Sequence, residues 1–249
     1  MPWPTVSFAT SCWERDWRWI LLQKDYLAQH QIARHCFPFA ERLLVINNVQ
    51  DMTAVKRAAE AQVDAGILTR YVVAEEKILP HFQLKRQDFG IEQQVSADWV
   101  FYNALAPLAA IYESRSEYLL YLTGDTYLEQ PIDWIRPALR WMEKDPMIKV
   151  ANLTWNGQYR EAKKEAYRTT WNFYQAKEGF SDQVFLVRGR DFRQAIYAEL
   201  RPDAAHFPRG DVFEKRVFSY MKNHGWERIT FRRGSYTHKN IIYRNEFGI

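Results

Sequence analysis

The feature that most constrains this chain is the alternation of short apolar runs with amphipathic segments in its first third. Strand-like runs at 5–9, 42–46 and 68–73 are separated by segments at 13–30 and 52–63, whose apolar residues recur at helical spacing. Alternation of this kind implies parallel strands joined by right-handed crossovers. The sequence therefore predicts an α/β protein with a mainly parallel central sheet flanked by helices.

A fourth strand is predicted at Tyr118–Leu122, and it ends at Thr123-Gly124-Asp125. The glycine marks a sharp change of backbone direction after the strand. Ligand crevices of open α/β sheets lie beyond the carboxyl ends of the strands, so Asp125 is a candidate metal ligand. Asp125 could equally cap a turn, and spacing alone favours neither interpretation.

The remaining segments continue the α/β pattern. We expect an irregular loop over 77–98, a helix over 98–112 that Pro107 kinks, and a helix that begins at 131–133. Turn residues Thr10 and Ser11 are expected after the first strand, Asp51 is expected to cap the second helix, and 158–180 is predicted to be helical or irregular. Further strands are expected at 148–153, 184–187 and 228–231, with a helix at 212–223.

Composition bounds the class of protein. A chain of 249 residues is near the upper limit for one core, and we predict a single domain over 1–249. Two cysteines without metal-binding spacing, no signal-peptide pattern and no membrane-length apolar run favour a cytoplasmic location. The net charge of +4 is scattered, so nucleic acid is not an expected partner. Arg228, Arg232 and Arg233 cluster, most simply as a solvated face, with an anionic ligand or a membrane surface as alternatives.

Polar residues follow the predicted strands in a consistent order. Thr10 and Ser11 follow the first strand, Asn47 the second and Glu75 the third, while Asn103 lies in the helix before Thr123-Gly124-Asp125. Later in the chain, Gly210-Asp211 precedes a helix that contains Arg216 and ends at Gly225, and His238 comes last.

This order of features, over nearly the whole chain, resembles the GT-A glycosyltransferase fold and its large family-2-like group. The resemblance implies a donor-binding half at 1–125 and an acceptor-binding half at 126–249. It assigns the nucleotide sugar to Thr10, Ser11, Asn47, Glu75, Asn103, Thr123 and Gly124. It assigns the metal to Asp125 and His238, the catalytic base to Asp211, and acceptor contacts to Gly210, Trp155 and Asp182.

The activity implied is transfer of a hexose, with inversion, from a UDP-, GDP- or dTDP-sugar to a glycan or lipid-linked acceptor. A divalent cation, Mn²⁺ or Mg²⁺, would stabilise the departing diphosphate, and a carboxylate would take the proton of the acceptor hydroxyl. We expect a role in a bacterial surface polysaccharide or glycoconjugate. Peripheral contact with the inner face of a membrane and the oligomeric state are left open.

Two departures from the family pattern support an alternative. Thr123 stands where the family usually has an Asp, and Gly210 stands where an acid is usual. A catalytically degenerate protein that binds a nucleotide sugar or acts as a scaffold is therefore the second hypothesis. A nucleotidyltransferase is disfavoured, because 7–13 contains no glycine for a phosphate loop.

Each candidate residue also has a purely structural interpretation. Asp211 could be a helix N-cap, and His238 could be an ordinary surface histidine. Asn47 and Glu75 could be turn residues, and Trp155 could belong to the core.

Overall fold

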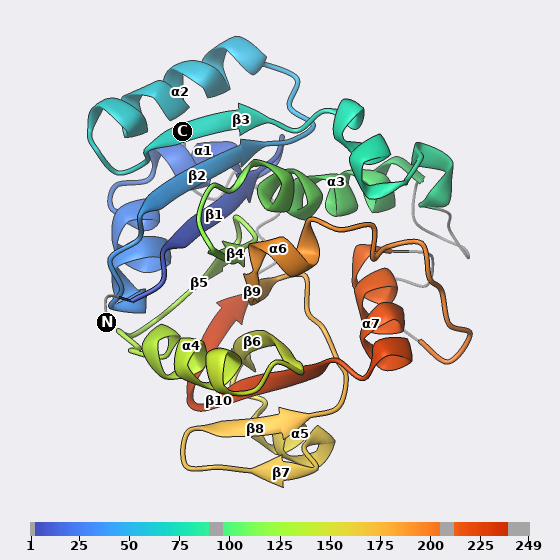
Figure 1. Cartoon of the computed structure of the whole chain (residues 1–249). Coiled ribbons are helices and arrows are strands. Elements are labelled where there is room, and N and C mark those ends of the chain that lie inside the picture. Colours follow the sequence, from blue (N-terminus) through green and yellow to red (C-terminus); the bar gives the residue numbers. More distant parts are fainter. Residues whose placement is uncertain (1–2, 90–96, 205–211, 239–249) are drawn as a thin grey trace.

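The computed structural model describes residues 3–89, 97–204 and 212–238, whose strands form one ten-stranded sheet. The order is β3-β2-β1-β4-β9-β6-β10-β8-β7, and β5 pairs with β10 (Figure 1). The strands are β1 (Val6–Cys12), β2 (Glu41–Ile46), β3 (Arg70–Val73), β4 (Tyr118–Leu122), β5 (Thr126–Tyr127), β6 (Ile148–Trp155), β7 (Arg168–Thr169), β8 (Phe173–Ala176), β9 (Val184–Arg188) and β10 (Glu227–His238).

Most of the sheet runs in one direction. β1 is parallel to β2 and β4, β2 to β3, and β6 to β10. β9 is antiparallel to both β4 and β6, so it joins the two parallel groups, while β8 and β5 also run against β10. The predicted α/β class with a mainly parallel sheet is confirmed.

Helices cover both faces of the sheet (Figure 1). One apolar core packs α1, α2 and α4 against one face, and a second core packs α3 and α7 against the other. Side chains of β4 contribute to both cores, because they point alternately to the two faces of the sheet. The first core contains Tyr118, Leu120 and Leu122, and the second contains Leu119 and Tyr121. The helices are α1 (Trp17–Leu22), α2 (Met52–Asp64), α3 (Ala97–Glu113), α4 (Ile135–Lys144), α5 (Tyr159–Glu165), α6 (Gly189–Phe192) and α7 (Phe213–His224).

The first crossover differs from its prediction. Thr10 and Ser11 lie within β1, two residues and one residue before its end at Cys12, and do not form a turn. The single helix expected to run to about His30 is α1 followed, after Asp25 in the left-handed region, by a π-helical segment at Tyr26–Ile32 and a 3₁₀ turn at Ala33–His35. Apolar spacing predicted the buried face and gave no sign of the break.

The bounds of several other helices and strands differ from those predicted. The predicted loop at 77–98 contains 3₁₀ turns at Glu76–Phe82 and Arg86–Asp88, and α3 continues through Pro107. The helix expected from 131–133 begins at Ile135. Segment 158–180 adds α5 and the strands β7 and β8, and the last strand runs on to His238. Asp51 caps α2 as predicted, its carboxylate accepting the Ala54 N–H at 3.0 Å.

The amino ends of the strands are fixed by a buried carboxylate. Glu41 accepts hydrogen bonds from the Ser7 hydroxyl at 2.6 Å, the Arg115 N–H at 2.9 Å and Nε of Arg70 at 2.8 Å. Burial alone raises the pKa of Glu41, but these bonds and the charge of Arg70 outweigh it, so the pKa lies below its ordinary value of 4.5. Glu41 therefore ties β1, β2 and β3 together at the edge opposite the carboxyl ends.

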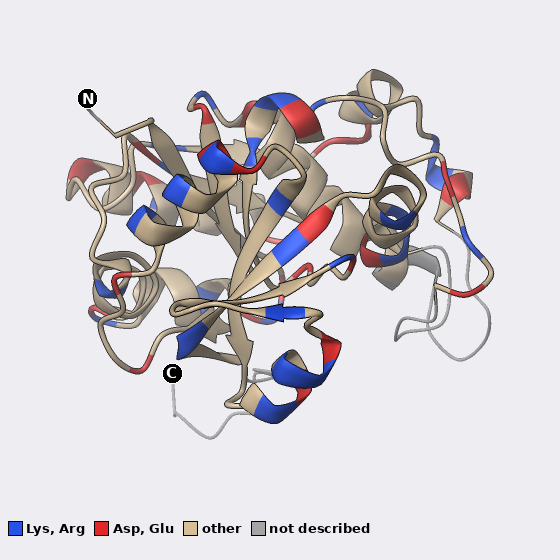
Figure 2. Ribbon diagram, turned by 60° about the horizontal axis from the view of Figure 1, so that its bottom comes forward, with Lys and Arg blue, Asp and Glu red and all other residues tan. Residues whose placement is uncertain are grey.

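Charged residues of both signs are interspersed along the ribbon (Figure 2). The three clustered arginines do not share one solvated face. Arg228 is only 9% exposed and pairs with Glu165, whereas Arg233 is exposed and its guanidinium lies 4.5 Å from the ring centre of Trp171. Within the described ranges, no helix combines the length and apolar character needed to cross a membrane.

Candidate active site

A cavity of about 400 Å³ opens at the carboxyl edge of the sheet. Its walls come from the ends of β1, β2, β4, β6 and β10, from α3, and from the loop that leads into β9. Because these strands run in the same direction, segments far apart in the sequence meet there, as expected for an open α/β sheet.

Most of the candidate residues line this cavity. They are Ser11, Asn47, Asn103, Thr123, Gly124, Asp125, Trp155, Asp182 and His238. Thr10 does not, because it is fully buried one residue earlier in β1, where side chains alternate between faces. Glu75 does not either; it lies beyond β3, half exposed, with its carboxylate paired to Lys77. Gly210 and Asp211 lie outside the described residues.

Asp125 and His238 meet at the wall of the cavity. Oδ2 of Asp125 lies 3.2 Å from Nε2 of His238, and both side chains are about four-fifths buried. The backbone of β10 holds His238 there, because His238 pairs with Thr126 of β5 and its N–H donates to Oδ1 of Asn156 at 2.8 Å. Burial lowers the pKa of His238, but the hydrogen bond and charge of Asp125, together with the charge of Asp182, reverse the effect and raise it.

This pair fits two ligands of one divalent cation. Two ligand atoms at right angles, each at about 2.1 Å from the ion, lie roughly 3 Å apart, close to the observed separation. A carboxylate oxygen with an imidazole nitrogen suits Mn²⁺ and similar ions. No group of three His, Cys, Asp or Glu with metal-binding geometry occurs in the described part of the chain. The remaining coordination positions would therefore fall to water or to a bound ligand.

A residue that the sequence analysis did not identify holds the turn that carries Asp125. Nε2 of the fully buried Gln31 donates to the carbonyls of Thr123, Gly124 and Thr126, at 3.2, 2.9 and 2.9 Å. The Tyr26 hydroxyl donates to the Gly124 carbonyl at 2.8 Å. Both side chains come from the π-helical segment, and such segments often mark functional positions. Sequence periodicity carries no signal for this role.

Negative charge is concentrated in the cavity. Asp16, Asp125 and Asp182 all line it, and no Lys or Arg does so among the described residues. Burial raises the pKa of Asp16 well above its ordinary value, and the charge of Asp125 adds to the rise. Burial also raises the pKa of Asp182 to about 6, with His238 opposing and Asp125 adding. Such crowding of carboxylates favours a cation in the cavity.

Polar groups of the first half face the same space. The hydroxyls of Ser11 and Tyr121 are 2.9 Å apart, and Nδ2 of Asn47 donates to the Tyr102 carbonyl at 2.8 Å. Oδ1 of Asn47 is buried and accepts no hydrogen bond from the described residues. Asn103 is exposed at the cavity wall. The Thr123 hydroxyl is hydrogen-bonded to that of Thr126 at 2.7 Å.

Comparison with known proteins identifies the fold. No protein-family model and no curated protein sequence matches the chain. Among solved structures, the mannosyltransferase PcManGT from Pyrobaculum calidifontis, in complex with GDP-Man and Mn²⁺, matches 96% of this chain and 57% of its own, at 14% identity and a TM-score of 0.50. GalNAc-T7 with UDP, GalNAc and Mn²⁺ matches 95% of this chain and 44% of its own, at 12% identity and a TM-score of 0.50.

The chain thus spans about half the length of these two structures. At this level of identity the likeness concerns the fold, and the GT-A fold predicted from the sequence is confirmed.

Proposed function

We propose that this chain is a glycosyltransferase that moves a hexose from a nucleotide-sugar donor to a hydroxyl of a glycan or lipid-linked acceptor. The observation that carries the proposal is the Asp125–His238 pair, held 3.2 Å apart in a cavity lined by three carboxylates and by no Lys or Arg side chain in the described ranges. A nucleoside diphosphate could enter such a cavity only together with a cation. The two GT-A structures that match this chain, PcManGT and GalNAc-T7, were both solved with Mn²⁺.

Residues 1–125 bind the donor, and 126–249 bind the acceptor. Ser11, Asn47 and Asn103 contact the nucleotide, while Asp125 and His238 hold Mn²⁺ or Mg²⁺. When bound, the cation would neutralise charge that develops on the diphosphate as the bond to the sugar breaks. The carbonyl contacts of Gln31 fix the turn of Asp125, so the carboxylate keeps its position.

Asp211 is the proposed base that accepts the proton of the acceptor hydroxyl. It stands two residues before α7 begins, and its neighbour Gly210 contacts the acceptor. Trp155, 45% exposed beside the cavity, offers an aromatic face to a sugar ring, and Asp182 offers a carboxylate to its hydroxyls. One base and one displacement step give inversion at the anomeric carbon.

The first test is thermal stability with UDP, GDP, CMP or dTDP, with and without Mn²⁺. A ligand at one hundred times its Kd adds about 2.7 kcal/mol, which corresponds to a rise in Tm of roughly 5–11 °C for a chain of this length. We expect one nucleotide to raise Tm only with Mn²⁺, and Asp125→Asn to abolish the rise. Asp64→Asn, at an exposed position on α2, is the matched control. No rise with any nucleotide would refute the proposal.

An activity assay with the matching nucleotide sugar separates turnover from binding alone. Thr123 stands where the family usually has an Asp and offers no carboxylate to a cation, so a degenerate, non-catalytic binding protein is the second candidate. That candidate predicts a full Mn²⁺-dependent rise in Tm together with no transfer and no hydrolysis of the matching nucleotide sugar. Loss of nucleoside diphosphate release in Asp211→Asn, with the rise in Tm retained, would favour the transferase.

The proposal extends to a cytoplasmic enzyme of bacterial surface-glycan synthesis that contacts the inner face of the membrane. Trp171, 77% exposed between β7 and β8, stacks under Arg233, and Arg232 donates from Nη1 to the Thr170 carbonyl at 2.5 Å. Tryptophan and arginine together suit an anionic interface. We expect co-sedimentation with anionic vesicles that falls severalfold in Trp171→Ala. Equal sedimentation of Trp171→Ala, or binding to neutral vesicles alone, would contradict this extension.

A further inference from the structure

Two more hollows continue from the active-site cavity. The inner hollow, of about 270 Å³, shares Trp155 and Gln183 with the cavity. The outer hollow, of about 560 Å³, shares Glu165, Glu214 and Arg228 with the inner one. The cavity, the inner hollow and the outer hollow therefore adjoin one another in a row. We call the two hollows together the groove.

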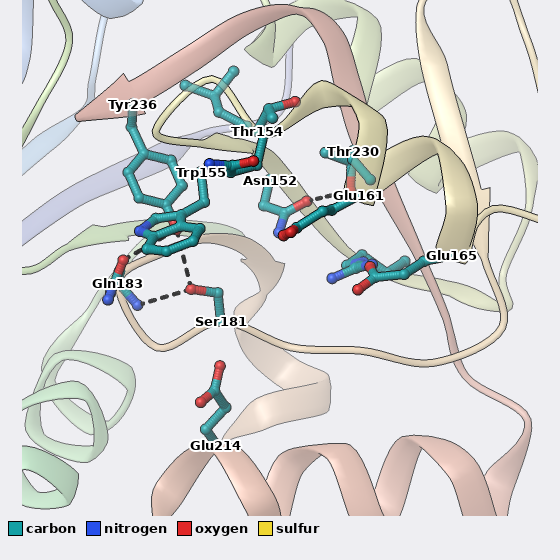
Figure 3. A pocket seen from close by; sticks show the side chains of 14 residues that line it. Asn152, Thr154, Trp155, Glu161, Glu165, Ser181, Gln183, Glu214, Thr230 and Tyr236 are labelled. Carbon is teal, nitrogen blue, oxygen red and sulfur yellow. Dashed lines mark hydrogen bonds and ion pairs between the residues drawn. The ribbon is translucent and has the colours of Figure 1, made fainter. Parts of the chain in front are cut away.

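The inner hollow lies between α5, α7, β6 and β10, entirely within the second half of the chain. Figure 3 shows Glu161 and Glu165 reaching into it from α5 and Glu214 from the first turn of α7. The indole of Trp155 stands at the end shared with the cavity. Amide and hydroxyl groups fill the wall between them, with Thr230 donating to Oδ1 of Asn152 at 2.8 Å.

Acidic side chains outnumber basic ones in the lining of the groove. Among the described residues its charged lining is four glutamates against one lysine and one arginine: Glu161, Glu165, Glu178, Glu214, Lys177 and Arg228. The arginine is already paired with Glu165. Burial raises the pKa of Glu214 well above its ordinary value, with the charge of Asp182 adding and that of Arg228 opposing. A phosphate or a carboxylate entering the inner hollow would lie beside Glu161, Glu165 and Glu214, where the one arginine of the lining is already paired.

A built donor lies between the two hollows. Arg228 lines both of them, its side chain is nine-tenths buried, and its Nε has no hydrogen-bond partner among the described residues. Because the guanidinium lines both hollows, its other N–H groups can donate to hydroxyls of a ligand. Aromatic faces accompany this donor, with Trp155 at the inner end and Tyr167, 52% exposed, in the outer hollow. Sugar rings present both hydroxyls and apolar faces, which suit this combination.

We infer that the groove binds the acceptor as an oligosaccharide of at least two units beyond the cavity, and that these units carry no acidic group. The inference rests on the proposed glycosyl transfer, because it takes the cavity as the donor site. The units that occupy the groove are neutral or amino-substituted sugars. A phosphate or diphosphate linkage of a lipid-linked acceptor would lie beyond the outer hollow, at least two sugars from the hydroxyl that reacts.

The test uses the whole chain, with Mn²⁺ and the nucleotide that raises its Tm, on an array of immobilised neutral, amino, uronate and phosphorylated glycans one to four units long. We expect binding to neutral or amino glycans of three or four units, and at least tenfold weaker binding to single sugars and to the acidic glycans. Glu161→Lys, at an exposed position of the inner hollow, should weaken binding about tenfold. Glu178→Lys, in the outer hollow, should weaken only the longer glycans.

Glu143→Lys is the matched control, an exposed glutamate on α4 that lies outside the cavity and the groove. Preferential binding of acidic glycans, equal binding of single sugars, or no glycan bound would each overturn the inference. In those cases an intact Mn²⁺-dependent rise in Tm leaves the proposed function standing. Loss of that rise in the wild-type chain would instead count against the donor site itself.

Discussion

Gly124→Ala gives a sharp test of how the turn after β4 is built. A Cβ at this position would lie less than 3.0 Å from the carbonyl oxygen of Ser11 and from Cδ1 of Ile20, and 3.1 Å from Oδ2 of Asp16. Ile20 is fully buried, and the Ser11 carbonyl belongs to the backbone of β1, so neither atom can move far. Overpacking costs about 1–3 kcal/mol where side chains can adjust, and we expect about 3 kcal/mol here.

That cost corresponds to a fall in Tm of roughly 6–12 °C for a chain of this length. Thermal unfolding followed by circular dichroism measures it. Gly66→Ala is the control, because Gly66 has a φ of +68° but no atom within 4 Å of its Cβ position. Its substitution therefore costs only the strain of a left-handed backbone at alanine, about 1 kcal/mol. If Gly124→Ala unfolds at the same temperature as Gly66→Ala or above it, the steric reasoning fails.

Two further predictions concern buried polar side chains. Gln31→Leu removes the donor to three carbonyls, so we expect about 2 kcal/mol of destabilisation. We also expect at least tenfold weaker nucleotide binding with Mn²⁺, measured by thermal shift. Unchanged binding would show that Gln31 does not position Asp125. Glu41→Gln should cost about 2 kcal/mol near pH 7, measured by urea unfolding. The pKa of Glu41 is lower in the folded state than in the unfolded state, so the stabilisation from its ionised carboxylate is complete above the ordinary pKa of 4.5 and is lost as the pH falls through the folded pKa. The stabilities of wild type and variant should therefore converge in acid. A difference in stability that grows in acid would contradict this expectation.

The candidate site was predictable where a polar or aromatic side chain stands at the end of a buried strand. Asp125, Asn47 and Trp155 stand at or just after strand ends, and parallel strands bring their carboxyl ends to one edge. Thr10 does not line the cavity because β1 runs three residues beyond the predicted end at residue 9, which buries its side chain. Glu75 lies outside the cavity because β3 is an edge strand, and the residue beyond it is half exposed and paired with Lys77.

What the sequence could not predict depends on contacts between distant segments. Gln31 reads as one polar position in an amphipathic helix, yet it holds the turn of Asp125 across 92 to 95 residues of sequence. The aromatic segment at 158–180 shows no clear period, because β8 is formed by pairing with β10, not by its own propensity. Arg228 appeared to belong to a basic cluster and instead lies buried beside Glu165, since pairing partners 63 residues apart leave no local pattern.

The ladder between β5 and β10 has a consequence for the order of events in binding. The pairing of Thr126 with His238, together with the bond from the His238 N–H to Asn156, holds Asp125 and His238 together through contacts of the fold itself. The conformational entropy of bringing the two side chains together is therefore lost during folding and does not reduce the affinity for the cation. A preorganised pair of this kind should capture an ion in a single fast step, without a slow rearrangement of the chain.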